Sequence, residues 1–379
     1  MAYIGRLSAI WLGKETDRWT PVSAQVWIPK TSGLLNPNLE VATDDSGYWV
    51  IDEVYDTFTT KASSSISLEG IVRDDFIGYL LLWALGSYEL CSLYKGTATG
   101  GTPKRWEWSS TAVIRKILVI GADTYYVINQ SGLTTLTNGT WTLSLTEVSG
   151  AYAHYFSRLN SNQHPSFTIR DVDDVAASLA PFCMENTFEL SCEVGDYVKF
   201  SAEFQGKAMV EDTTSPAPAY SDEQAFTAAM AGVRFASNEA WLNSASEVCM
   251  QNFRISINKN LTDIQCFGST DIAGIYNQQF GVEWDFEALY SDTTIRDYVL
   301  NSDKLAVRFY AINTNATALA TGVYPSIYVD LMKAWFTEWS KSDSANEIVK
   351  QTLWFSGQYS NEDWATMEIV LINWNSAGY

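Results

Sequence analysis

The segment Phe188–Lys207, FELSCEVGDYVKFSAEFQGK, alternates apolar and polar residues with a period of two. This is the period of a β-strand that has one buried and one solvated face, and it does not suit a helix. Gly195-Asp196 interrupts the pattern and supplies a tight turn. The segment therefore predicts an antiparallel hairpin with one wet face. Its expected apolar face consists of Phe188, Leu190, Cys192, Val194, Val198, Phe200, Ala202 and Phe204.

A second segment, Phe280–Glu287, alternates in the same way, with Phe280, Val282, Trp284 and Phe286 on one face. Aromatic residues make up 14% of the 379-residue chain, with 15 Trp and 20 Tyr. Aromatic side chains suit half-buried strand surfaces and packed interfaces. Because apolar residues reach 46%, the chain can bury a substantial core. We expect a mainly β protein.

Helical signals are few and short. Asp74-Asp75 precede the apolar run FIGYLLLWALG, and Gly86 provides a stop. A second helix is predicted over Asp292–Asn301, and Ser221–Met230 is a third candidate.

The first two helices have similar surroundings, which indicates a degenerate tandem duplication. A strand leads into each helix, and strands follow near the end of each half: Phe188–Gln205 in the first, and the pair Ile348–Gly357 with Trp364–Ile372 in the second. Residues 210–220 are acidic and rich in Pro and Thr, as expected of a linker. We therefore predict two domains, residues 1–209 and 221–379, with a strand-rich surface insertion at about 96–149.

Acidic residues outnumber basic residues by 44 to 24, giving a formal net charge of −20. Binding to a phosphate backbone needs clustered Lys and Arg, and the longest basic runs are Lys104-Arg105 and Arg115-Lys116. Nucleic-acid binding is therefore not expected. DNA that passes without adhering is compatible with this charge, because like charges repel.

The five cysteines are odd in number and have no CxxC spacing, which favours buried, reduced thiols. No basic region followed by an apolar run is present at Met1–Trp11, so no signal peptide is expected. The most apolar segment, Phe76–Leu85, is about half the length of a bilayer span. We expect a soluble protein without a membrane anchor.

Residue patterns for catalysis are sparse, and we predict no catalytic, metal or cofactor site. His154 and His164 lie in a Ser- and Asn-rich loop without a G-x-S-x-G elbow, and no GxxxxGK[ST] phosphate loop occurs. A glycosidase-like carboxylate pair could come from Asp173-Asp174 or from Glu283, Asp285 and Glu287. The latter three alternate with apolar residues, which favours a solvated strand face.

Several segments occur in the order found in the tail tube proteins of long-tailed siphovirus bacteriophages, and the sequence resembles that family over most of its length. They are Gly13-Lys14-Glu15-Thr16 with Ala24–Pro29, SISLEGIVRDDFIGYLLLWALGS, His164–Asp171, the hairpin Phe188–Lys207, and Ile369–Tyr379.

The resemblance implies a β-sandwich or split-barrel tube fold with a short flanking helix in each half. It also implies inner strands that join those of neighbouring subunits in a continuous β-barrel, and stacked rings through which the genome is ejected into the host. Three chains would supply six tube domains in a pseudo-sixfold ring. Six chains per ring is the alternative if only one half lines the lumen.

The partners implied are further copies of the chain, other tail proteins at the tube ends, and phage DNA that passes without specific binding. The implied location is the tail of the virion, after synthesis in the host cytoplasm. A hydrated, negative wall would let DNA slide. The candidate channel-lining residues are Glu189, Glu193, Glu203, Glu283, Asp285 and Glu287, although either set could instead face outward.

Two other functions fit parts of the sequence. A carbohydrate-binding β-sandwich that recognises the host receptor would use Trp106, Trp108 or Trp141 as sugar-stacking platforms. A two-carboxylate hydrolase would need a cleft that holds a buried carboxyl with a raised pKa.

Overall fold

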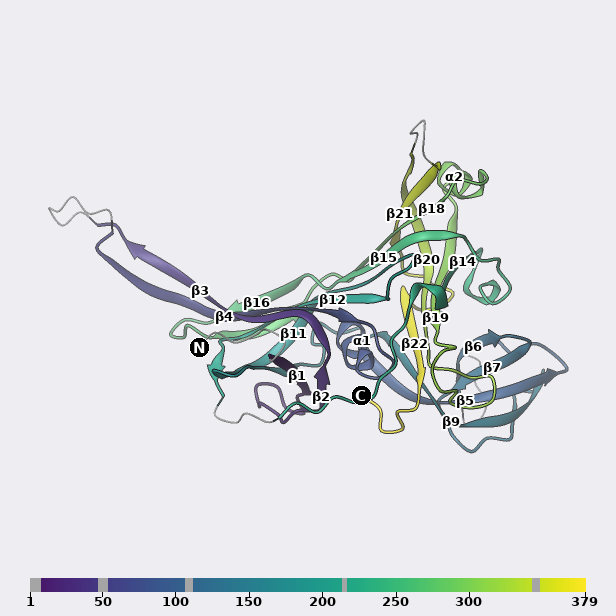
Figure 1. Cartoon of the computed structure of the whole chain (residues 1–379), viewed down its shortest axis with the longest axis horizontal. Coiled ribbons are helices and arrows are strands. Elements are labelled where there is room, and N and C mark those ends of the chain that lie inside the picture. Colours follow the sequence, from purple (N-terminus) through teal and green to yellow (C-terminus); the bar gives the residue numbers. More distant parts are fainter. Residues whose placement is uncertain (1–7, 47–53, 106–111, 213–216, 343–347) are drawn as a thin grey trace.

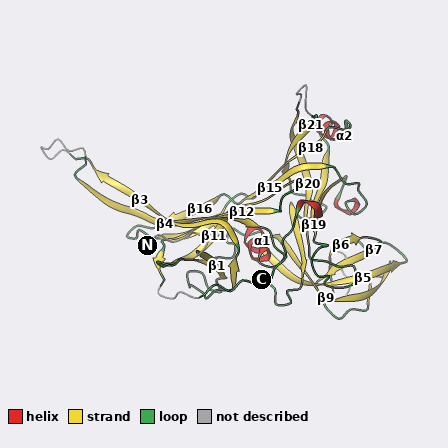
Figure 2. Ribbon diagram, in the orientation of Figure 1, coloured by secondary structure: helices red, strands yellow, loops and turns green. Residues whose placement is uncertain are grey.

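Strands make up most of the structure, and this confirms the mainly β fold expected from the period-two segments (Figure 2). The computed structural model describes residues 8–46, 54–105, 112–212, 217–342 and 348–379. Within these residues there are two α-helices, α1 (Ile77–Leu85) and α2 (Thr294–Leu300).

A central antiparallel sheet of eight strands runs through the molecule, and it is built from residues of both halves of the sequence (Figure 1). Its strands, in spatial order, are β3 (Lys30–Asp44), β4 (Asp56–Ile71), β12 (Lys199–Lys207), β11 (Ala177–Glu193), β15 (Met250–Asn258), β18 (Gly281–Leu289), β21 (Lys350–Gly357) and β20 (Ser326–Lys341). At one end, β3 and β4 extend beyond the other strands as a long arm.

The predicted hairpin is confirmed as β11 and β12, in a register that places Phe188 opposite Ala202 and Leu190 opposite Phe200. Gly195 adopts a φ of 87°, a left-handed conformation that glycine adopts without steric cost, and so permits the turn. The expectation was wrong for Val194. It lies beyond the end of β11, and its side chain is 66% exposed.

Both main helices lie where the sequence predicts them. α1 ends at Gly86, which has a φ of 85° and donates its N–H to the Leu82 carbonyl. The helix is buried on nearly every side, because it lies within the main hydrophobic core behind the central sheet. The third candidate helix, Ser221–Met230, is wrong. Only a 3-10 turn, Ala228–Met230, forms there.

The segment before that turn is extended because its backbone bonds to two neighbouring segments. Ala225 bridges Arg73, and Thr227 bridges Tyr197, as in antiparallel strands. Tertiary pairing therefore overrides the helix propensity of SDEQAFTAAM.

Smaller sets of strands flank the central sheet. On the first half, β11 continues through β10 (Phe167–Val172) to β1 (Ala9–Lys14) and β2 (Val26–Ile28), and also pairs with β13 (Val210–Glu211). On the second half, β20 pairs with β19 (Lys304–Ile312), which pairs with β14 (Ala231–Ala236). The expected pairing of the last two strands is wrong. β21 and β22 (Met367–Asn373) bond to successive parts of one edge of β20, and β19 bonds to the other edge.

Two sets of six strands have the same spatial order. The first is β1, β10, β11, β12, β4 and β3, and the second is β14, β19, β20, β21, β18 and β15. A short helix follows β4 in the first set and β18 in the second. Three register shifts also correspond. They lie at residues 167/169 and 305/307, at 185/187 and 336/338, and at 30/32 and 250/252.

Five strands between α1 and β10 form a separate lobe with its own core (Figure 1). They are β5 (Gly86–Thr99), β6 (Ile114–Ile120), β7 (Asp123–Ile128), β8 (Thr135–Thr137) and β9 (Thr142–Arg158). The strands therefore extend beyond both ends of the 96–149 region marked by the sequence. A further small sheet consists of β16 (Leu261–Gln265) and β17 (Ile272–Asn277).

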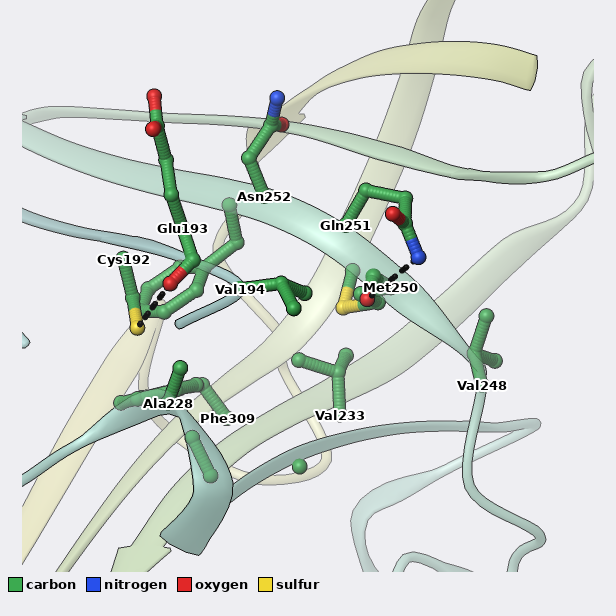
Figure 3. Close-up of a pocket in the computed structure, with 13 residues that line it drawn as sticks. Cys192, Glu193, Val194, Ala228, Val233, Val248, Met250, Gln251, Asn252 and Phe309 are labelled. Atoms are coloured by element: carbon green, nitrogen blue, oxygen red, sulfur yellow. Dashed lines mark hydrogen bonds between the residues drawn. The ribbon is translucent and has the colours of Figure 1, made fainter. Parts of the chain in front are cut away.

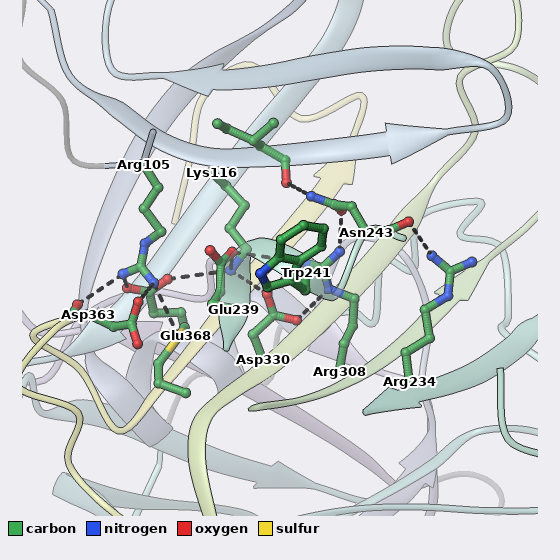
Figure 4. A network of polar contacts seen from close by, with 12 residues as sticks. Arg105, Lys116, Arg234, Glu239, Trp241, Asn243, Arg308, Asp330, Asp363 and Glu368 are labelled. Carbon is green, nitrogen blue, oxygen red and sulfur yellow. Dashed lines mark hydrogen bonds and ion pairs between the residues drawn. The ribbon is translucent and has the colours of Figure 1, made fainter. Parts of the chain in front are cut away.

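A buried network of charged side chains joins this lobe to the second half (Figure 4). Lys116, on β6, is 1% exposed; it forms ion pairs with Asp330 and, at 2.6 Å, with Glu239. Arg308 binds Asp330 through two hydrogen bonds of 2.7 and 2.8 Å. Burial alone would raise the pKa of Asp330, but the Arg308 and Lys116 charges hold that pKa below its usual value. The carboxylates are therefore tolerated in the interior because cations match them.

We predict that Lys116→Met destabilises the fold by about 3–5 kcal/mol, because it leaves Asp330 and Glu239 buried with one cation fewer. Denaturant unfolding measures the loss. The matched control is Lys95→Met in the same lobe, because Lys95 pairs with Asp123 at 2.6 Å but its side chain is 53% exposed. The control should lose much less stability, because an exposed ion pair contributes little. Equal losses would contradict the role assigned to the buried network.

The buried acid Glu223 lies beside the start of α1. It accepts hydrogen bonds from the Phe76 N–H at 3.2 Å and from the Ser221 hydroxyl at 2.8 Å. Burial raises the pKa of Glu223 from 4.5 to about 7. The folded state therefore binds this proton more tightly than the unfolded state. The resulting stability is lost as the pH rises from about 4.5 to 7.

We predict that Glu223→Gln gains stability relative to the natural chain as the pH rises from 4.5 to 8, by about 1–3 kcal/mol. The glutamine carbonyl oxygen can keep the hydrogen bond from the Phe76 N–H, its NH₂ can donate to the Ser221 hydroxyl oxygen, and the side chain carries no charge. Urea unfolding at each pH measures the difference. Glu211→Gln, at an exposed position on β13, is the control and should show no such gain. A pH-independent difference for Glu223→Gln would refute the proposed proton linkage.

Candidate channel face of the central sheet

The central sheet has one buried and one solvated face across both halves. On the buried face, aromatic and aliphatic side chains of neighbouring strands pack into the core; they include Leu68, Phe200, Leu190, Ile255, Trp284 and Phe355. On the opposite face, polar side chains alternate with these along the strands from β4 to β18, and β21 presents Thr352, Trp354 and Ser356 on that face. This alternation is the reason the sheet can be wet on one side only.

All six acidic residues singled out in the sequence lie on the solvated face. Glu189 and Glu193 are on β11, Glu203 is on β12, and Glu283, Asp285 and Glu287 are on β18. The two groups are close because β11 pairs with β15, which pairs with β18. The structure therefore brings the two sequence-distant sets together on one surface.

Arg254 on β15 ties the two sets to each other. Its Nε donates to Glu189 Oε2 at 2.7 Å, and its Nη1 lies 3.7 Å from Asp285 Oδ1. The hydrogen bond to Glu189 raises the pKa of Arg254, while partial burial raises the pKa of Asp285. Because the Arg254 side chain is 52% exposed, these contacts are screened by water and salt.

Two lysines on this face are also held by carboxylates. Lys350 lies 2.6 Å from Glu287, and Lys199 lies 2.5 Å from Asp196 in the β11–β12 turn. Glu69 on β4 adds a further exposed acid, which the sequence analysis missed. Extending the period-two pattern to ISLEGI and FRISIN would have placed Glu69 and Arg254 on this face.

A pocket opens at the end of β11, where Cys192 and Glu193 meet Val233, Met250 and Phe309 (Figure 3). Its volume is about 80 Å³. Sites for small molecules usually measure about 300–1,000 Å³. The pocket is therefore a small gap in the packing beside the solvated face.

The family model of phage tail tube protein matches residues 5–357. This match covers nearly the whole chain. The chain belongs to the phage tail tube protein family. A comparison with curated proteins gave no match. Membership makes this a structural protein of the virion tail, consistent with its mainly β fold.

The histidines of this tail tube protein are both buried. His154 lies between Tyr88 and Asn373, with Nε2 at 2.8 Å from Asn373 Oδ1, and His164 Nε2 lies 3.1 Å from the Leu159 carbonyl. Burial lowers the pKa of each to about 4. Within the residues that the structure describes, no group of three or more His, Cys, Asp or Glu side chains could hold a metal ion.

The residues suggested for other functions have different surroundings. Asp173 accepts the N–H groups of Val175 and Ala176 and so closes a turn. Glu283, Asp285 and Glu287 lie on the open sheet face. Trp141 is 4% exposed in the core of the lobe and cannot stack on a sugar, while Trp106 and Trp108 lie outside the described residues.

Neither α-helix in the described part of the tail tube protein is long and apolar enough to cross a bilayer.

We predict that Arg254→Gln destabilises the tail tube protein by about 1 kcal/mol or less at physiological salt, and by more at low salt. Removing the guanidinium leaves Glu189, Asp285 and Glu283 to repel one another. Urea unfolding at 10 and 500 mM NaCl measures the salt dependence. Lys199→Gln is the control, because its ion pair lies within one turn. Loss of stability that does not change with salt would contradict a role through charge.

Proposed function

We propose that three copies of this chain form a ring, that the rings stack into the tail tube of a siphovirus, and that the solvated face of the central sheet lines the channel for genome ejection. The observation that carries this proposal is the continuity of that face. Two halves of the sequence contribute four strands each to one sheet whose polar side is open to solvent. Other tail proteins would cap the two ends of such a tube.

The proposed ring rests on a tandem duplication, with tube-like units at residues 1–209 and 221–379 joined by residues 210–220. The shared order of six strands, the helix after β4 and β18, and the three corresponding register shifts support it. Strand order alone recurs among unrelated folds, whereas irregularities at matching positions are specific features of a fold. Within the proposed joining segment, Val210–Glu211 form β13, and residues 213–216 lie outside the described part of the chain.

The strand count favours three chains over six. Three sheets of eight strands give 24 strands, and at about 4.8 Å per strand the wall has a circumference of about 115 Å and a diameter of about 37 Å. Strand tilt widens it somewhat further. A DNA duplex about 20 Å across fits inside with its water. Six chains that each contributed all eight strands would give a channel about 73 Å across, far wider than the duplex requires. Six chains would match the narrower channel only with one half of each chain in the wall, but β11 and β15 join the two halves in one sheet.

The charges on this face suit a wall that DNA must pass without sticking. Three acids, Glu193, Glu203 and Glu283, are exposed and form no ion pair among the described residues. The cations Arg254, Lys199 and Lys350 are each held by a carboxylate. Phosphates would therefore meet net negative charge and few available cations, which disfavours counterion-release binding.

The first test is electron microscopy of the purified chain at increasing concentration. We expect rings with three chains, each of 42.3 kDa, that stack into tubes. A chain that stays monomeric under all assembly conditions would refute the tube function. Rings of six chains would refute the proposed stoichiometry.

The second test reverses the charge of the channel face. Tubes of the triple variant Glu193→Lys, Glu203→Lys and Glu283→Lys should retain short duplex DNA and protect it from nuclease, whereas tubes of the natural chain should not. The control carries the same charge change at exposed sites away from the central sheet, Asp174→Lys, Glu211→Lys and Glu362→Lys. DNA bound by the control should stay nuclease-sensitive. Nuclease-sensitive DNA on the channel variant would place this face outside the tube.

A further inference from the structure

The central sheet ends in two edges that have no strand partner among the described residues. At one end, β3 pairs with β4 on one side only. At the other end, the last part of β20, Phe336–Lys341, pairs with β21 and extends past β19. Exposed backbone edges of this kind are sites where another chain can add a strand.

The junction between the two halves of the chain shows how two such edges can pair. There β11 pairs with β15 in one continuous register, with Phe188 opposite Ile257, Glu189 opposite Ser256 and Ser191 opposite Arg254. β11 is the last central strand of the first half, and β15 is the first central strand of the second.

The register shifts allow this pairing to be transferred residue by residue. The shift at 185/187 on β11 corresponds to 336/338 on β20, so Glu189 is equivalent to Ser340. The shift at 30/32 on β3 corresponds to 250/252 on β15, so Ser256 is equivalent to Asn36. The two free edges are thus the counterparts of the two strands that meet inside the chain.

We propose that β20 of one copy pairs antiparallel with β3 of the next copy, with Ser340 opposite Asn36. The same register places Glu338 opposite Asn38 and Ser342 opposite Leu34. This inference rests on the proposed tube function and identifies its interface: the non-covalent junction between subunits repeats the β11–β15 junction within one subunit.

The backbone geometry of the edges agrees with this register. In the internal junction Lys259 donates its N–H to the Asn186 carbonyl at 2.9 Å, and Val194 donates to the Gln251 carbonyl at 3.0 Å. Hydrogen-bonded pairs alternate along antiparallel strands, so Phe188–Ile257 is one and Glu189–Ser256 is not.

The counterpart of Ile257 is Pro37, whose nitrogen has no hydrogen to donate. The subunit junction therefore lacks one bond that the internal junction has. Leu35, the next donor on that side, faces the Asp171 carboxylate in the single chain and must change partner on assembly. Both features make this junction weaker than the internal one.

The side chains on the solvated side differ between the two junctions in a way that favours association. The internal junction holds the ion pair of Arg254 with Glu189, whereas the counterpart positions are Leu34 and Ser340. Asn36, Leu34 and Ser340 are exposed in the single chain. Desolvating paired charges is a large cost when interfaces form. Bringing these three side chains together does not incur that cost.

Disulfide trapping tests the register directly. Directly opposed residues of a non-hydrogen-bonded pair have Cα atoms about 4.5 Å apart, within the range of a disulfide. The test variant carries Asn36→Cys and Ser340→Cys. The background replaces Cys249 and Cys266 with Ser, because both are exposed, contrary to the sequence-based expectation. The control, Asn38→Cys with Ser340→Cys, is out of register by two residues.

After mild oxidation of assembled tubes, we expect covalent dimers and trimers from the test pair in at least tenfold excess over the control, as seen on a non-reducing gel. Each single cysteine should give neither product. Tubes that form but do not cross-link through the test pair would refute this junction while leaving the tube function intact. Equal cross-linking by the control would refute the register. A chain that forms no rings at all would refute the tube function and the junction together.

Discussion

The pairing of β11 with β15 is the contact on which the rest of the architecture depends. It joins the first half of the chain to the second through seven consecutive residue pairs, Thr187–Asn258 to Glu193–Asn252. Because side chains alternate along each strand, a slip of one residue here would turn the polar side of one half toward the core of the other. The register therefore gives the sheet one continuous wet face and one continuous buried face.

The balance of acidic and basic side chains differs between the solvated face of this sheet and the interior of the protein. On the solvated face, acids outnumber cations, and water screens the excess. In the interior, Lys116, Arg308 and Arg105 are balanced against Asp330, Glu239 and Glu368, and those side chains are almost fully buried. An unpaired charge would be far more costly there than on the wet face. The charges of this buried network therefore balance one another, whereas the solvated face carries an excess of acids.

Local features could be predicted from the sequence, whereas long-range pairings could not. The β11–β12 hairpin and α1 were predictable because alternation, a glycine turn and a glycine stop all lie within a few residues of one another. The double pairing of β20, with β22 along one part and β21 along another, depends on contacts that no local pattern encodes. In the sequence Lys116 is only part of the short basic run Arg115-Lys116, because nothing near it reveals the carboxylates of Asp330 and Glu239. Alternation alone identified the six acids. Their placement on one common face depends on the β11–β15 register, which the sequence does not reveal.

In the proposed assembly of duplicated chains, the same type of strand junction would occur twice, once within the subunit and once between subunits. Inside the chain, the linker removes most of the entropic cost of bringing the halves together. That junction can therefore hold Arg254 between Glu189 and Asp285, although ordering these side chains has a cost. Between chains the full cost of association applies, and the positions concerned hold Ser, Asn and Leu, together with a proline on the edge strand. Edge prolines discourage indiscriminate strand addition. Under the proposed duplication, the difference between the residues at these two junctions follows from the different physical demands on each.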